Sequence, residues 1–302
     1  MGSKCVEIAR DRAKDRAIIT KVARDLTQKC REYRDSADAR AQGFYPYFRR
    51  IDDTVGNHVV CDGQTKIMIG SNNYLGLAQD ERVIEAACDA ARKFGSGCTG
   101  SRLLNGNIRL HEELEDALAD FLQREAVLLF STGFFANQGA IATLTEDEDA
   151  ILCDRENHAS IIDGCQFAPA KLVPFRHNSA VSLRNRLKRL PEECGKLVVL
   201  DGVFSMSGDI ADLPPILEVA KEFGAFTYVD EAHALGVLGP EGRGTVHHFG
   251  VNDDVVDVVA RARALAEDVA AAAPFAPFAP DDLAQVPLTF HSPHLRSLFP
   301  IG

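Results

Sequence analysis

The chain alternates between two hydrophobic patterns from residue 80 to residue 259. Segments with apolar residues every three or four positions predict amphipathic helices, and short uninterrupted apolar runs predict buried strands. The expected helices are residues 81–94, 110–122, 134–144, 159–165, 179–190 and 215–223, and the expected strands are residues 126–130, 150–153, 172–175, 197–200, 225–229 and 255–259. This alternation predicts an α/β fold, in which a mostly parallel sheet carries helices on both faces.

The N-terminal region has a helical pattern of its own. Apolar side chains recur every four positions at Ile18, Val22, Leu26 and Cys30. This spacing predicts a helix with one apolar stripe, which fits either a helix packed on its own domain or an arm that docks on a partner. Two short strands are expected around residues 59–61 and 66–69, with an Asp-Gly turn between them.

The chain changes character after residue 259. Residues 260–302 are rich in Ala and Pro, so we expect a mostly irregular segment beyond a helix at about 260–272. We therefore divide the chain into an N-terminal helical arm at 1–55, a large domain at 56–259 and an atypical tail at 260–302.

Composition and charge narrow the class of protein. The 302 residues are 46% hydrophobic and 25% charged, which is ordinary for a globular protein. A net charge of −11 disfavours a nucleic-acid-binding face, and no apolar run is long enough to span a membrane. The eight cysteines form no Cys-x-x-Cys pair, and the N-terminus lacks the apolar core of an export signal. We therefore expect a cytoplasmic protein with free thiols and no metal site.

Polar clusters follow four of the predicted strands, at residues 131–134, 154–158, 201–209 and 230–233. Ligands of open α/β sheets bind at the carboxyl ends of the strands, so these clusters are expected to form one site. A helix that begins near Gly133 favours a phosphate, His158 can stack on a flat ring, and a buried Asp230 needs a cation such as a protonated pyridine nitrogen. Together they predict a pyridoxal-phosphate site.

The same clusters carry a family resemblance. The chain resembles the α-oxoamine synthases, which are fold-type-I pyridoxal-phosphate enzymes that condense an amino acid with an acyl-CoA thioester and release carbon dioxide. The matching motifs are residues 71–77 (SNNYLGL), 95–106 (GSGCTGSRLLNG), 131–134 (STGF), 157–161 (NHASI), 203–209 (VFSMSGD), 230–233 (DEAH) and 242–244 (GRG). They run in family order within residues 43–259, so the resemblance implies a PLP-binding large domain with a sheet of the family's seven-stranded type.

The resemblance implies a role for each matching residue. The implied cofactor-binding residues are Gly133, Phe134, His158, Ser205, Asp230 and His233. His158 would stack on the pyridine ring, Asp230 would pair with its nitrogen and His233 with its hydroxyl group, and these three are also the implied catalytic residues. The implied substrate residues are Asn73, near the amino-acid carboxylate, and Thr99, Ser101 and Arg102 at the substrate entrance.

Three segments narrow the resemblance within the family. Residues 94–106, 175–179 and 196–206 resemble soluble bacterial serine palmitoyltransferase, which joins serine to a long-chain acyl-CoA to begin a sphingoid base. Glycine C-acetyltransferase and 8-amino-7-oxononanoate synthase share the same skeleton and stay open as alternatives. The resemblance also implies a homodimer.

One residue that the family requires is missing. The lysine that forms the Schiff base with the cofactor should follow the strand at 255–259, but the sequence there continues with Ala260, Arg261, Ala262 and Arg263. The last lysine of the chain is Lys221, and arginine forms no Schiff base because its guanidinium stays protonated. We therefore expect an inactive chain without the family's small C-terminal domain, produced by a frameshift or truncation. The alternative is a non-catalytic subunit that pairs with an active paralogue.

Overall fold

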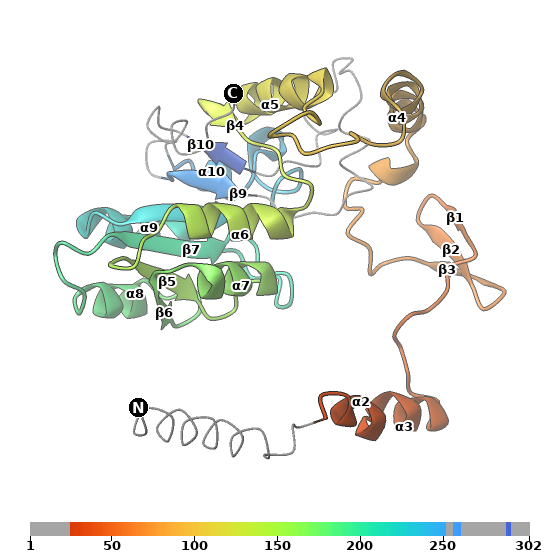
Figure 1. Ribbon diagram of the computed structural model, residues 1–302, viewed down its shortest axis with the longest axis horizontal. Coiled ribbons are helices and arrows are strands. Elements are labelled where there is room, and N and C mark those ends of the chain that lie inside the picture. The colour runs from red at the N-terminus through yellow and green to blue at the C-terminus, as the bar shows by residue number, and fades with distance from the viewer. Residues whose placement is uncertain (1–24, 252–255, 261–287, 291–302) are drawn as a thin grey trace, which may run out of the picture. The chain divides into compact units, whose positions relative to one another are not determined.

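The computed structural model describes residues 25–251, 256–260 and 288–290 (Figure 1). The chain forms two compact units. One holds the described residues up to Thr54 together with His58–Lys66, and the other holds Val55–Asn57 together with the described residues from Ile67 onward. The expected helix at about 260–272 and two residues of the N-terminal apolar stripe, Ile18 and Val22, lie outside the described residues.

The described part of the N-terminal region contains two short helices, α2 (Gln28–Glu32) and α3 (Asp35–Ala41). The largely helical pattern of this region is thus divided between two helices, because Tyr33 adopts an extended conformation (ψ 114°) between them. Asp35 and Asp38 lie in the first turn of α3, where negative charge is favourable at a new helix start. The apolar stripe is not buried at Leu26, which is 79% exposed.

A three-stranded sheet follows, with the strand order β1 (Asp53–Val55), β2 (His58–Cys61) and β3 (Gln64–Ile67). The predicted Asp-Gly turn connects β2 to β3. Asp62 and Gly63 both have positive φ values, 56° and 70°, as a two-residue hairpin turn requires. The third strand begins at Gln64 rather than at Lys66, and β1 was not predicted.

A seven-stranded sheet forms the centre of the second unit, with the order β4-β10-β9-β8-β7-β5-β6. Its strands are β4 (Ala126–Val127), β5 (Ala150–Asp154), β6 (Lys171–Phe175), β7 (Lys196–Asp201), β8 (Phe226–Asp230), β9 (Val258–Ala260) and β10 (Leu288–Phe290). Strands β5 to β9 pair in parallel, as predicted. Strand β10 lies antiparallel between β4 and β9. The prediction of an irregular tail is therefore wrong at residues 288–290, because pairing with two neighbours holds this segment extended.

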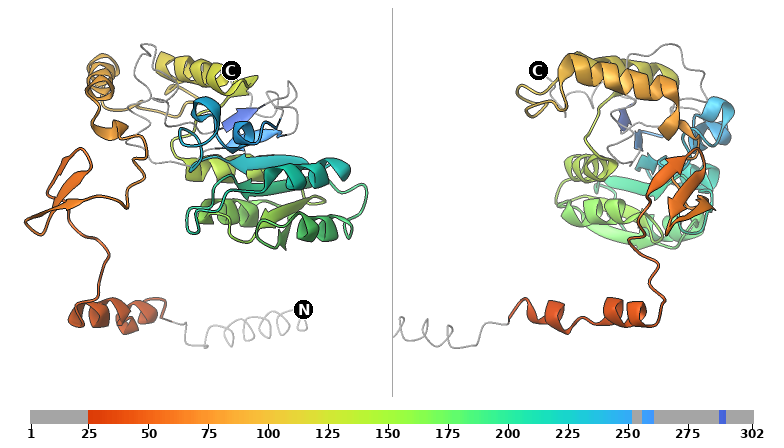
Figure 2. Two further views of the ribbon diagram at one scale, coloured as in Figure 1. Left: turned by 180° about the vertical axis from the view of Figure 1, so that it is seen from behind. Right: turned by 90° about the vertical axis from the view of Figure 1, so that its right-hand side faces the viewer.

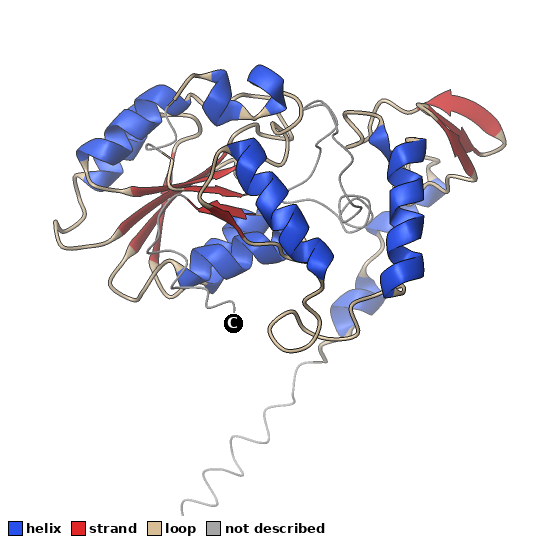
Figure 3. Ribbon diagram, turned by 90° about the horizontal axis from the view of Figure 1, so that it is seen from above, coloured by secondary structure: helices blue, strands red, loops and turns tan. Residues whose placement is uncertain are grey.

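Six helices of the second unit agree closely with the predicted ones. They are α4 (Glu81–Phe94), α5 (Arg109–Leu122), α6 (Gly133–Thr143), α7 (Ala159–Phe167), α8 (Ala180–Leu187) and α9 (Leu213–Glu222). The short α10 (Thr245–His248) and the 3-10 turns η1 (Leu77–Gln79) and η2 (Pro240–Gly242) were not predicted. Helices lie on both sides of the sheet, as the views of Figures 2 and 3 show. No helix in the described ranges is both long and apolar enough to cross a bilayer.

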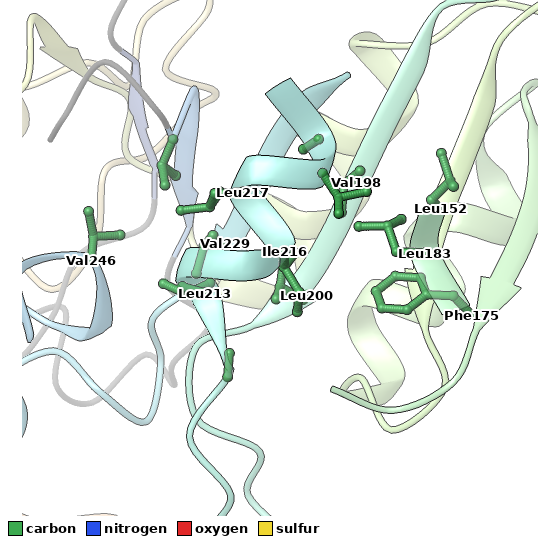
Figure 4. Close-up of a cluster of buried hydrophobic side chains, with 14 of the residues drawn as sticks. Leu152, Phe175, Leu183, Val198, Leu200, Leu213, Ile216, Leu217, Val229 and Val246 are labelled. Carbon is green, nitrogen blue, oxygen red and sulfur yellow. The ribbon is translucent and has the colours of Figure 1, made fainter. Parts of the chain in front are cut away.

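Alternating strand residues feed two separate cores, one on each face of the sheet. Ile151 and Val199 pack with α6 and α7 on one face. On the other face Leu152 and Leu200 pack with α8 and α9, in the cluster drawn in Figure 4. This two-sided burial fixes the strand register, because a shift by one residue would exchange the side chains of the two faces.

A substitution of Phe175, at the end of β6, tests the core that Leu152 and Leu200 form with α8 and α9. Its side chain is 0% exposed, so Phe175→Ala should lower the free energy of unfolding by about 3–5 kcal/mol, through lost burial and the cavity left behind. Phe167→Ala is the matched control, since Phe167 is 76% exposed and should change stability by under about 1 kcal/mol. Urea unfolding followed by circular dichroism measures both. Equal effects would show that Phe175 is not in a packed core.

Candidate functional site

The carboxyl ends of the parallel strands bring three of the predicted polar clusters to one edge of the sheet. Strands β7 and β8 end together, and Asp201 is the register partner of Asp230. Strand β5 ends at Asp154, next to β7, and its cluster leads into α7. Strand β4 points the same way as β9, because β10 runs antiparallel to both. The polar cluster that follows β4 leads into α6. This edge therefore carries the predicted site.

Asp230 is a buried carboxylate, 1% exposed, at the end of β8. Its Oδ2 accepts a hydrogen bond from Nδ2 of Asn137 at 2.9 Å, and its Oδ1 accepts one from the backbone N–H of Ala232 at 2.9 Å. Both donors are neutral. Because a buried carboxylate is stabilised most by a cation, these bonds orient Asp230 and leave it suited to a positively charged ligand atom.

Asn137 connects three elements through one side-chain amide. Its two amide hydrogens are donated to Oδ2 of Asp230 and, at 2.8 Å, to Oγ of Ser160, while its Oδ1 accepts from the hydroxyl of Tyr228 at 2.7 Å. The sequence reading missed Asn137 and Ser160. The signal was available, because Asn137 is a polar residue on the buried stripe of α6 that also holds Ala136 and Ala140.

His158 caps the N-terminus of α7 and presents an exposed ring. Its Nδ1 accepts a hydrogen bond from the backbone N–H of Ser160 at 3.2 Å and lies 2.7 Å from Oγ of that residue. Its backbone N–H donates to Oδ2 of Asp201 at 2.7 Å. With Nδ1 acting as an acceptor, the neutral ring carries its proton on Nε2, and one ring edge is fixed while its face stays open to a ligand.

The start of α6 supplies backbone donors. Thr132 is the N-cap, and its Oγ1 accepts from the N–H of Phe135 at 3.2 Å. Gly133 is buried and Phe134 is 39% exposed, and both lie in the first turn of this 11-residue helix. N–H groups in the first turn of a helix favour a phosphate or another anion.

The predicted residue His233 lies three positions after Asp230 and is joined to a distant motif. Its Nδ1 lies 2.7 Å from the hydroxyl of Tyr74. The neighbouring Asn73 uses its Oδ1 to accept from the N–H of Ala78 at 3.2 Å, which stabilises its own turn. The structure therefore brings the motif at 71–77 to the end of β8 through Tyr74. The role of Asn73 near the amino-acid carboxylate stays a prediction.

Ser205 lies on an exposed turn after β7. The turn is stabilised by the segment after β6, where His177 contacts Asp154 through Nδ1 at 3.0 Å and Asp209 through Nε2 at 3.2 Å. Asn178 adds a hydrogen bond from Nδ2 to the carbonyl of Ile210 at 2.9 Å. The sequence reading did not identify His177 as part of the site.

The residues predicted at the substrate entrance differ in their contacts and in their exposure. Arg102 donates to both carboxylate oxygens of Glu115, at 2.7 and 3.1 Å, and to the carbonyl of Leu129 at 3.0 Å, so it ties α5 to the segment that leads into α6. Thr99 is exposed with a φ of 53°, and Ser101 is exposed. The structure thus gives Arg102 a positioning role and leaves Thr99 and Ser101 accessible.

Burial dominates the electrostatics of this edge. It raises the pKa of Asp201 to about 8, and the negative charge of Asp230 adds to the increase. For His177 burial acts to lower the pKa, but the hydrogen bonds and charges of Asp154 and Asp209 outweigh it, and the pKa is raised. The edge thus contains both a carboxyl group whose neutral form is favoured and an imidazole whose protonated, charged form is favoured.

A cavity of about 460 Å³ lies at the opposite edge, where β5, β7 and β8 begin. Leu144, Asp149, Lys196, Phe226 and Asp257 contribute to its lining. None of the ten predicted site residues lines this cavity, so it belongs to a different part of the sheet.

Comparisons with known proteins relate the chain as a whole to a family and a fold. The model of the family "Aminotransferase class I and II" matches residues 64–265. A serine palmitoyltransferase from Sphingobacterium spiritivorum is 46% identical over 230 residues, which cover 76% of this chain and 58% of the relative. An 8-amino-7-oxononanoate synthase from Lysinibacillus sphaericus is 46% identical over 214 residues, 71% of this chain and 55% of the relative. The chain therefore spans little more than half the length of these relatives.

A solved structure shows the same fold. The structure of a serine palmitoyltransferase from S. paucimobilis with a bound PLP–myriocin aldimine superposes with a TM-score of 0.78 at 37% sequence identity. The match covers 91% of this chain and 68% of that chain. The fold is thus that of the fold-type-I pyridoxal-phosphate transferases.

The raised pKa of His177 predicts a pH-dependent stability. A protonated His177 holds the Ser205 turn through two carboxylates. Its contribution to the free energy of unfolding is therefore complete below the unfolded pKa of about 6.5, and it is lost as the pH rises through the higher folded pKa. His177→Gln should therefore destabilise the protein by about 1–2 kcal/mol at pH 6 and by less at pH 9. Thermal unfolding across this range measures the effect.

His248→Gln is the matched control. His248 is exposed and also meets a phenylalanine ring edge-on, with 4.9 Å between the centroids of His248 and Phe249, against 4.4 Å for His177 and Phe204. The control should change stability by under about 0.5 kcal/mol, because the side chain of His248 is exposed. A His177→Gln effect that is equal at pH 6 and pH 9 would rule out an ionic contribution from this histidine.

Proposed function

The chain belongs to the aminotransferase class I and II family and to its α-oxoamine synthase branch, and on that premise we propose that it carries the cofactor cradle of a pyridoxal-phosphate-dependent acyltransferase. The reaction of that enzyme class would be the decarboxylative condensation of an amino acid, serine in the first place, with a long-chain acyl-CoA. The relatives named serine palmitoyltransferase support this choice of substrates.

One observation carries the proposal: the hydrogen-bonded chain from Asp230 through Asn137 and Ser160 to the exposed ring of His158. It places a buried carboxylate and a flat aromatic ring at the same edge of the sheet, where α6 also begins. This donor set fits pyridoxal phosphate, which has a basic ring nitrogen, a flat ring and a phosphate. When bound, the cofactor supplies an electron sink for charge that develops on the amino-acid substrate.

Each residue has a proposed task toward that ligand. The N–H groups of Gly133 and Phe134 lie beside the phosphate. Asp230 holds the ring nitrogen protonated, His158 stacks on the ring and His233 donates to the ring oxygen. The family resemblance implies these tasks, and the placement of the groups at one edge of the sheet supports them.

The remaining predicted residues would act further from the ring. Ser205 faces the cofactor from its exposed turn. Asn73 lies near the amino-acid carboxylate. Thr99, Ser101 and Arg102 form the substrate entrance, with Arg102 acting through its contact with Glu115.

The absent lysine limits what this chain can do alone. Ala260, Arg261, Ala262 and Arg263 stand where the family has its lysine, so no amine is supplied at that position to bond to the cofactor or to move the substrate's α-proton. We propose that the chain binds the cofactor without a covalent bond and does not complete the reaction by itself. The alternative, a non-catalytic subunit beside an active paralogue, predicts a stable heterodimer.

Assembly and location follow from the same proposal. We propose a homodimer, supported by Leu103 and Leu104, which are 79% and 84% exposed within the motif at 95–106. The seven cysteines in the described ranges are free thiols, which supports a reducing, cytoplasmic location. We propose that residues 1–55 act as an arm and that residues 56–259 hold the cofactor. The tail at 260–302 is not wholly separate from them, because its segment Leu288–Phe290 pairs with β4 and β9 in the large sheet.

Two other activities of the branch are the second candidates. 8-Amino-7-oxononanoate synthases are also among the similar proteins, at 45–52% identity, and glycine C-acetyltransferase shares the same skeleton. The cofactor-loaded chain can be titrated with serine, alanine and glycine while its absorbance is recorded. A spectral change with serine at the lowest concentration supports the first choice, and a preference for alanine or glycine supports one of the others.

Asp230→Asn tests the cofactor assignment. The substitution removes the charge that keeps the ring nitrogen protonated, so the affinity for pyridoxal phosphate should fall by about 1.5–3 kcal/mol, or roughly 10- to 150-fold. Equilibrium titration by fluorescence measures it. Asp163→Asn, on the exposed side of α7, is the matched control and should leave the affinity unchanged. Equal affinities of the Asp230→Asn variant and the wild-type chain would remove Asp230 from the site.

The absent lysine predicts a negative labelling result. After incubation with pyridoxal phosphate and reduction by borohydride, mass spectrometry should find no lysine with stoichiometric phosphopyridoxyl label, because no amine is fixed beside the cofactor. Equilibrium dialysis of the unreduced sample shows that the cofactor was bound. Complete labelling of one lysine would show that another part of the chain supplies the amine.

A further inference from the structure

A second buried carboxyl group faces the same site as Asp230. Asp201 ends β7 as Asp230 ends β8, and the two are register partners in parallel strands. Neighbouring strands lie about 4.8 Å apart, and register partners point to the same face. The Asp201 and Asp230 side chains are 3% and 1% exposed, so two carboxyl groups face the same buried space.

The two groups have different hydrogen-bond partners. Asp230 accepts from the side chain of Asn137 and the backbone of Ala232. Asp201 accepts from the backbone N–H of His158 through Oδ2 at 2.7 Å, and the backbone N–H of Asp201 donates to Oδ1 of Asn157 at 3.0 Å. Asp201 is therefore the group that fixes the backbone of the stacking histidine.

We propose that Asp201 is a positioning residue of the cofactor site, which holds His158 in place and leaves the Asp201–Asp230 pair with one negative charge rather than two. This inference rests on the proposed function. The single charge would reside on Asp230, which accepts from the side-chain amide of Asn137 as well as from a backbone N–H and which is proposed to pair with the ring nitrogen. Two adjacent buried carboxylates cannot both ionise at low cost, and the neutral member must then be Asp201.

The groups around Asp201 agree with this assignment. Asp230 and Tyr228 face it from β8, Cys153 and Asp154 act on it from β5, and His158 contacts it from the start of α7. Burial first, and then the charge of Asp230, raise the pKa of Asp201 to about 8. At pH 7 the side chain is thus mostly a neutral acid.

The sign of the linked pH dependence follows directly. Between the unfolded pKa of about 3.9 and the folded pKa of about 8, the folded chain keeps a proton on Asp201 that the unfolded chain has lost. The contribution of Asp201 to the free energy of unfolding therefore falls as the pH rises, and it levels off above about pH 8. Asparagine copies the neutral acid and can still accept from His158, but it does not titrate.

The first arm of the test compares melting temperatures of Asp201→Asn and the wild-type chain without added cofactor from pH 5 to pH 9. The melting temperature of the variant, minus that of the wild type, should rise by several degrees between pH 5 and pH 8 and should not rise further above pH 8. Asp163→Asn, exposed on α7, is the control and should show a flat difference. A difference for Asp201→Asn that is flat, or that shrinks as the pH rises, would overturn the single-charge pair.

The second arm measures pyridoxal-phosphate affinity. Asp201→Leu removes the acceptor for the His158 N–H and should weaken binding about tenfold, while Asp201→Asn should restore most of that loss. Equal affinity of the Leu variant and the wild type would overturn the positioning role, and if the Leu variant does not fold, Asp201→Glu, which displaces the acceptor, takes its place. A wild-type chain that binds no pyridoxal phosphate would overturn the proposed function, whereas the melting curves still decide the charge of the pair.

Discussion

The hydrogen bond from Asn137 to Asp230 organises the edge of the sheet on which the chemistry depends. It joins the first turns of α6 to the end of β8, and the same amide reaches Ser160 and through it His158. A carboxylate at 1% exposure without such donors would be strongly disfavoured. With them it is held ready for a cation, so the rest of the cradle can be understood as support for this one buried charge.

The sheet explains why these residues meet. Parallel pairing of β5, β7 and β8 sends their carboxyl ends to one edge, and the two cores on opposite faces hold the register. The end of β7 then lies beside the end of β8, which places Asp201 next to Asp230. The connecting segments after β6 and β7 are tied together by His177 and Asn178, which hold the turn that carries Ser205.

The cradle and the missing amine lead to different conclusions about the chain. The groups that we propose to orient a cofactor lie at the carboxyl ends of the strands, from the start of α6 to His233. The lysine that would follow β9 is replaced by Ala and Arg residues, and arginine cannot form a Schiff base. Cofactor binding and turnover are therefore separate questions for this chain, because orientation depends on hydrogen bonds and buried charge while proton transfer depends on an amine at one position.

Local patterns in the sequence determined most of the elements and the family. Helix α4 begins and ends at the predicted residues 81 and 94, the Asp-Gly turn between β2 and β3 has the predicted backbone, and the clusters after β5, β7 and β8 lie where the strand ends were expected. These features depend on neighbours within a few positions, so a linear pattern is enough to show them. The positions of His158, Asp230 and His233 beyond the strand ends were expected in this way, and their roles stay predictions.

Only the tertiary structure decided which side chains act together. The partners Asn137 and Asp230 are 93 residues apart, and Tyr74 and His233 are 159 apart, so no local pattern could pair them. The placement of β10 between β4 and β9, and of Asp201 beside Asp230, likewise depends on strand order. Burial of a polar group and the partner that satisfies it are properties of the packed sheet, and for that reason they appear only when distant segments of the chain are brought into register.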